Sequence, residues 1–200
     1  MQRIIDNPGT SLALGAGIAA AILIGWLVAG GGDAMLVFSF LMRFLHVLSA
    51  MLWVGLIVFV NFVQLVALQG ADDNARGVLG KAIVPQVAWW FRHASTAVVV
   101  TGAVLLLTAG YLLPAIAYGT GVFVPPGRAI LLWGGVLGGL VMWMFVHMYI
   151  WPSLQVALGM RPGDAKAKTD ARARVLLFAR LNLVIAVPVT LAMMAAAHLA

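Results

Sequence analysis

Long apolar runs, separated by short polar or glycine-rich breaks, dominate the sequence. The runs cover roughly residues 10–30, 36–69, 84–113, 127–158 and 171–199. Each is long enough for a helix to cross a bilayer, which takes about 20 residues. The breaks are the turn Gly30–Asp33, a polar 70–83, a Pro- and Gly-rich 114–127 and a charged 159–170. The pattern predicts five transmembrane helices, and residues 1–200 are expected to form a single polytopic membrane domain.

Composition agrees with this pattern. Of the 200 residues, 64% are hydrophobic and only 9% are charged, which is too little polar surface to cover a water-soluble domain. The expected fold class is an all-α integral membrane protein with the lipid bilayer as its surroundings. The net charge of +6 comes from Lys and Arg residues that mostly flank the apolar runs. We therefore interpret them as topology signals and expect no nucleic-acid partner.

The distribution of basic residues predicts the orientation of the helices. The N-terminus and the second and fourth breaks carry most of them: Arg3, Arg76, Lys81, Arg161, Lys166, Lys168, Arg172 and Arg174. The first break and the C-terminus have none. The positive-inside rule therefore predicts a cytoplasmic N-terminus and a C-terminus on the outer side. An odd number of spans requires the same arrangement.

Missing residue types exclude several kinds of site. The chain has no cysteine, which excludes disulfides, iron–sulfur clusters and the covalent attachment of c-type haem. It also has no glutamate, and its only acidic residues are six aspartates. A di-iron site of the Glu-x-x-His type is therefore not expected. The sequence offers no acid–base or nucleophilic set, so no catalytic residue is assigned.

Four histidines fall in four different spans, the second to the fifth. His46 and His198 belong to the outer half of the membrane, while His93 and His147 belong to the inner half. Two pairs at two depths predict bis-imidazole ligation of one or two b-type haems, with the iron bound by these four side chains. The second to fifth helices would then form a four-helix haem-binding bundle, beside an additional N-terminal helix.

Three arginines lie near these histidines and are candidates to pair with the anionic haem propionates. Arg43 is placed for the outer haem, and Arg92 and Arg180 are placed for the inner one. Arginine suits this role because its guanidinium can bind a carboxylate through two parallel hydrogen bonds.

Other interpretations of the polar residues stay open. A single histidine in a membrane helix can simply bond to a neighbouring helix. Met142, Met144 and Met148 near His147 could bind copper or fill the core. Four glycines of the fourth span are best explained by close helix packing: Gly134, Gly135, Gly138 and Gly139. Three polar residues at membrane depth are best explained by inter-helix hydrogen bonds, and they could also line a quinone or substrate site: Asn61, Gln64 and Asn182.

Four segments in order carry a family resemblance: LHVLSAMLWVGLIVFVNFVQ (Leu45–Gln64), WWFRHAS (Trp89–Ser95), MWMFVHMYIWP (Met142–Pro152) and ARLNLVIAVPVTLAMMAAAH (Ala179–His198). Together they resemble the membrane domain of bacterial membrane-bound urate oxidases (urate hydroxylases), in a short form without the cytochrome c domain. The resemblance implies a protein of the bacterial inner membrane with a periplasmic C-terminus. Among the candidate haem ligands, the resemblance supports His46 and His198 first. It also implies a cytochrome c or another redox subunit as partner.

The expected function is a membrane-bound b-type cytochrome that transfers electrons, as a subunit or partner of a larger redox complex. One alternative is a urate-oxidase-like membrane oxidoreductase that uses an external cytochrome c. Another is a non-redox membrane scaffold or a copper-handling protein. Quinone is a further candidate partner of the first two.

Overall fold

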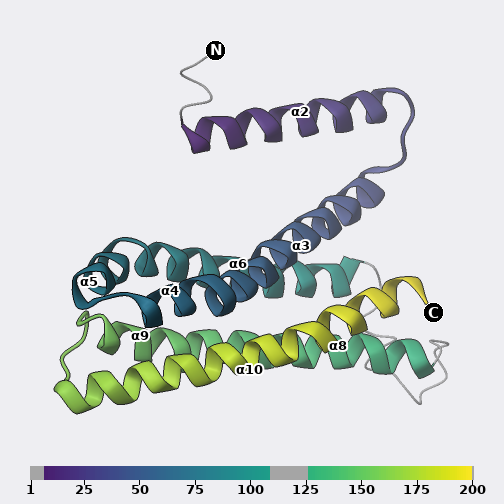
Figure 1. The fold of residues 1–200 in the computed structure, drawn as a ribbon. Helices are drawn as coiled ribbons and strands as arrows, with labels where there is room; N and C mark the ends of the chain where they lie inside the picture. Colours follow the sequence, from purple (N-terminus) through teal and green to yellow (C-terminus); the bar gives the residue numbers. More distant parts are fainter. Residues whose placement is uncertain (1–6, 109–125, 200) are drawn as a thin grey trace. The chain divides into compact units, whose positions relative to one another are not determined.

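The computed structural model describes residues 7–108 and 126–199, and in these ranges every regular element is a helix (Figure 1). Within these residues, five helical spans are long and apolar enough to cross a membrane: Pro8–Val28, Ala34–Gly70, Asp73–Thr108, Gly127–Ala157 and Ala165–His198. This is the architecture of a multi-pass helical membrane protein, and it confirms the predicted number of helices able to span a membrane. The Pro- and Gly-rich break predicted at 114–127 lies mostly outside the described residues.

The chain divides into two compact units, residues 1–40 and 41–200. In the first unit, α2 (Pro8–Val28) begins at Asn7, whose side chain accepts a hydrogen bond from the Gly9 amide at 2.8 Å. None of its side chains is buried within the protein, as expected for a helix surrounded by lipid. The turn that follows contains Gly30 and Gly32, with φ angles of +92° and +83° that favour glycine.

The first helical hairpin is made by one long interrupted helix and one continuous helix. The interrupted one starts as α3 (Ala34–Phe59), whose first residues belong to the first unit, continues through the π-helical η1 (Val60–Gln64) and ends as α4 (Leu65–Gly70). The returning one is α6 (Val84–Thr108). Between them the predicted polar break is mostly a short helix, α5 (Asp73–Ala82), because Asp72 caps its N-terminus by accepting from the Ala75 amide at 2.7 Å.

The second hairpin has a similar construction. It contains α8 (Pro126–Met144), the π-helical η2 (Phe145–Ile150) and α9 (Trp151–Ala157), followed by α10 (Ala165–His198). The helix α10 begins six residues before the predicted span, so half of the predicted charged loop is helical. Asp164 caps it through the Ala167 amide at 2.7 Å, and Lys166 pairs with Asp170 at 2.8 Å. Its first turns therefore extend the apolar span with a polar segment.

The core of the second unit lies where α3, α6, α8 with η2, and α10 meet. Its buried side chains are Trp53, Ile57, Phe91, Ala94, Met142, Val146 and Ala186. The helix α10 packs along α8, η2 and α9, and Tyr149 of η2 stacks on Phe178 of α10 at 4.2 Å. Most other large apolar side chains point outward, because lipid can solvate them.

Candidate functional site

All four histidines have the same ring nitrogen, Nδ1, next to a backbone carbonyl oxygen. In each, Nδ1 lies within hydrogen-bond distance of a backbone carbonyl oxygen: Val98 for His46 at 3.0 Å, Trp89 for His93 at 2.7 Å, Trp143 for His147 at 3.0 Å and Met194 for His198 at 2.9 Å. A carbonyl oxygen only accepts, so Nδ1 must carry the proton in every case. In a neutral imidazole Nε2 then carries the lone pair and is the atom that could bind a metal.

His93 and His147 come from segments that contact each other, α6 and η2. Thr96, three residues after His93 on α6, lies within hydrogen-bond distance of the His147 ring. Each ring stacks on a tryptophan one turn earlier on its own helix. The centroid distances are 4.0 Å between Trp89 and His93 and 4.5 Å between Trp143 and His147. The structure brings these two predicted ligands into one neighbourhood.

Thr96 links the two helices at this point. Its hydroxyl lies 3.2 Å from Nε2 of His147 and accepts from the indole Nε1 of Trp143 at 3.3 Å. Because Nδ1 of His147 carries the proton, the threonine hydroxyl donates to Nε2. Both His93 and Thr96, three residues apart on α6, are exposed, so this side of the pair is open at the bundle surface.

His46 lies against the second half of α6. Its Nδ1 is also 3.2 Å from the Thr101 hydroxyl. A Cβ built on Gly102 would come within 2.9 Å of the imidazole Cε1, so only glycine leaves room for the ring here. His46 thus lies level with residues five to nine positions beyond His93 on the same helix. At about 1.5 Å per residue this is roughly 8–14 Å along the axis.

His198 is exposed in the last turn of α10, where its hydrogen bond is to its own helix. Within the described residues, no hydrogen bond or ring contact joins it to His46. Among the described residues, no hydrogen bond or ring contact joins the two histidines of either predicted pair, and the inner pair is linked through Thr96 of α6, which bonds to His147.

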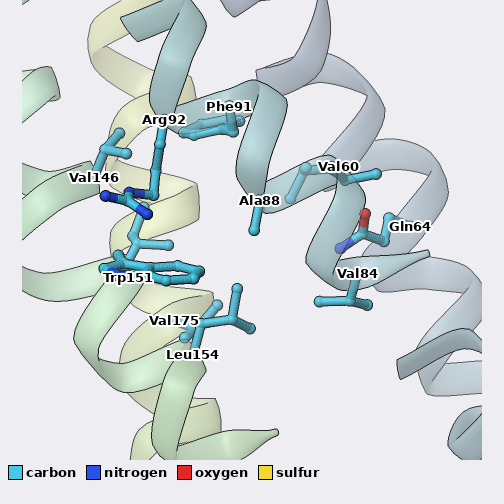
Figure 2. Close-up of a pocket in the computed structure, with 12 residues that line it drawn as sticks. Val60, Gln64, Val84, Ala88, Phe91, Arg92, Val146, Trp151, Leu154 and Val175 are labelled. Carbon is cyan, nitrogen blue, oxygen red and sulfur yellow. The ribbon is translucent and has the colours of Figure 1, made fainter. Parts of the chain in front are cut away.

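Of the three predicted propionate partners, Arg92 has the most defined surroundings. Its guanidinium carbon lies 4.3 Å above the Trp151 ring, a cation–π arrangement, and its buried Nε has no hydrogen-bond partner in the described part of the chain. It lines a cavity of about 50 Å³ between η1, α6, η2, α9 and α10 (Figure 2). Arg43 and Arg180 are exposed.

This cavity is too small for a large cofactor, because pockets for such ligands start at about 300 Å³. Among the described residues there is also no group of three or more His, Cys, Asp or Glu side chains that could hold a metal ion. Of the methionines near His147, Met142 is buried in the core and Met148 is exposed.

Thr96, Trp143 and Gly102 are site residues that sequence reasoning missed. A weak signal existed for two of them. Thr96 follows His93 by three residues, and Trp143 precedes His147 by four, so each shares a helix face with its histidine. Gly102 had no such signal, because its role depends on which helix packs beside His46.

Comparisons of the chain with protein-family models, with curated proteins and with solved structures gave no match. The resemblance to the membrane domain of urate oxidases therefore stays a prediction from the quoted segments.

Proposed function

We propose that the protein is a membrane-bound b-type cytochrome that transfers electrons through bis-histidine haem, as a subunit or partner of a larger redox complex. One observation carries the proposal. Four imidazoles on four membrane helices all donate Nδ1–H to a backbone carbonyl and present Nε2. Metal-ligating histidines are usually fixed in this way, because the second hydrogen bond sets both tautomer and ring orientation.

His93 and His147 are the pair with the most support. Their donor atoms fit haem iron, their rings are held by stacked tryptophans, and their shared side is open. When bound, haem b supplies a one-electron iron couple. The carbonyls of Trp89 and Trp143 keep the two ring orientations, and Thr96 must release Nε2 of His147 before that atom can bind iron.

Arg92 lies beside this pair and would bind a propionate carboxylate, with Arg180 as a second candidate. For the outer pair, His46 and His198 with Arg43, the support is only the hydrogen bond from Nδ1 of each ring to a backbone carbonyl. We infer an inner-membrane location, with a cytoplasmic N-terminus and a periplasmic C-terminus. A cytochrome c or another redox subunit would then exchange electrons with the protein, and quinone is a further candidate.

Substitution of His147 tests the proposal directly. His147→Ala should remove the low-spin haem signal assigned to the inner pair, since one axial ligand is lost. His147→Met should keep haem bound and raise its reduction potential, because methionine ligation favours ferrous iron. The readouts are the optical spectrum, electron paramagnetic resonance and a potentiometric titration.

Thr96→Val provides the matched control. It removes the hydroxyl that bonds to Nε2 of His147 but leaves the imidazole in place, so haem should be retained. Unchanged haem content and potential in both His147 variants would contradict ligation by this residue. Loss of haem in Thr96→Val equal to that in His147→Ala would contradict it as well.

A further inference from the structure

Two buried asparagines of the bundle core have amide atoms without partners. Asn182 of α10 is 0% exposed, and neither its Nδ2 nor its Oδ1 has a hydrogen-bond partner among residues 7–108 and 126–199. Asn61 of η1 is 1% exposed, and its Nδ2 donates to the carbonyls of Ile57 at 2.9 Å and Ala179 at 3.2 Å, while its Oδ1 has none. A buried amide atom without a hydrogen-bond partner destabilises the folded protein, because its bond to water is lost and not replaced. A hydrogen-bonding molecule beside these atoms would therefore stabilise the bundle.

The two amides belong to one junction between helices. Ala179, Asn182 and Ala186 follow one another at helical spacing on one buried face of α10. The carbonyl of Ala179 binds Asn61, and Ala186 belongs to the core cluster that contains Ile57. Asn182 thus lies between these two contacts, level with the turn from Ile57 to Asn61.

The cavity of about 50 Å³ lies next to this junction. Gln64, three residues after Asn61 in the same π-helical segment, lines it with a buried Oε1 that has no partner. Arg92 contributes its unpartnered Nε from the other side (Figure 2). At about 10–15 Å³ for each water, a cavity of this size has room for a few molecules.

The hydrogen-bonding character of the unpartnered atoms indicates which molecule they would bind. Asn182 offers a donor and an acceptor, Asn61 and Gln64 offer acceptors, and Arg92 offers a donor. An anion would satisfy only the donors and a cation only the acceptors, whereas water satisfies both. We propose that η1 and α10 hold a chain of internal water molecules that enters through the Gln64–Arg92 cavity and ends at Asn182. This hydrated inlet does not depend on haem binding.

Radiolytic labelling of the protein in lipid nanodiscs tests the inlet. Hydroxyl radicals formed from bound water oxidise the side chains beside it. Ile57 is 1% exposed, whereas Val184 and Val187 face outward on α10. In isotopically labelled water, Ile57 should nevertheless incorporate the labelled oxygen several times faster than these two valines. Labelling of Ile57 no faster than that of these two valines would overturn the proposal.

Asn182→Leu provides the second arm, with Asn74→Leu on the exposed side of α5 as the control. The first should lower the labelling of Ile57 several-fold, and the control should leave it unchanged. Undiminished labelling in a folded Asn182→Leu protein would contradict the placement of water at this amide. If that variant does not fold, Gln64→Leu should lower the same signal by closing the entrance, and an unchanged signal there would contradict the route.

Discussion

At the scale of single residues, the His46 ring packs closely against Gly102. Gly102→Ala would force a methyl group to within 2.9 Å of the imidazole. Overpacking of this kind costs about 1–3 kcal/mol, so the unfolding temperature in detergent should fall. Gly55→Ala on α3, where the new methyl group meets nothing within 4 Å, is the control. Equal unfolding temperatures for the two variants would contradict the contact.

Local spacing made some of the site predictable and left the rest hidden. The stacking of Trp143 on His147 and of Trp89 on His93 follows from four-residue spacing on a helix. The hydrogen bond from Thr96 to His147 joins residues 51 positions apart. No pattern within one helix could reveal it, because it depends on how α6 packs beside η2.

At the scale of elements, the glycines of the two Gly-Gly pairs in α8, at positions 134, 135, 138 and 139, differ in what they face. A methyl group on Gly138 would come within 2.4 Å of a Val189 side-chain carbon, and one on Gly135 within 2.9 Å of Met193, whereas Gly134 and Gly139 meet nothing within 4 Å. The predicted packing role thus applies to the two glycines that face α10. Small residues let membrane helices approach closely.

Alanine substitutions should distinguish the face of α8 that packs against α10 from the face that does not. Gly138→Ala should destabilise the α8–α10 pair, because the Val189 methyl group has to move, whereas Gly139→Ala should have little effect. Thermal unfolding in detergent, followed by circular dichroism, measures both. A Gly139→Ala protein as unstable as Gly138→Ala would show that close packing against α10 is not the reason for glycine at position 138.

Hydropathy predicted the number of helical spans, but it missed two polar helical segments. Residues 73–82 and the start of α10 contain many charged and small residues, so no apolar period marks them. Their helices instead begin at the capping side chains of Asp72 and Asp164. The π-helical segments η1 and η2 were also not predicted, because single-residue insertions in a helix leave the apolar run unbroken.

At the scale of the whole molecule, the orientation in the membrane is a prediction that labelling can check. The chain has no cysteine, so a single introduced one reports its own side. Asn74→Cys should be protected from a membrane-impermeant maleimide in intact cells, because the basic second break is predicted to be cytoplasmic. Asp33→Cys should react. The opposite result at both positions would reverse the orientation, and with it the assignment of His93 and His147 to the cytoplasmic half.

Ligation of haem by the imidazoles on these helices can be measured as the haem content of the purified protein. The purified protein, produced in cells supplied with haem, should show a b-type pyridine haemochrome spectrum and a reducible low-spin haem, with one or two haems per chain. Two haems would support both histidine pairs, and one would support a single pair. A folded, helical preparation without haem would contradict the account and leave the four imidazoles with structural roles alone.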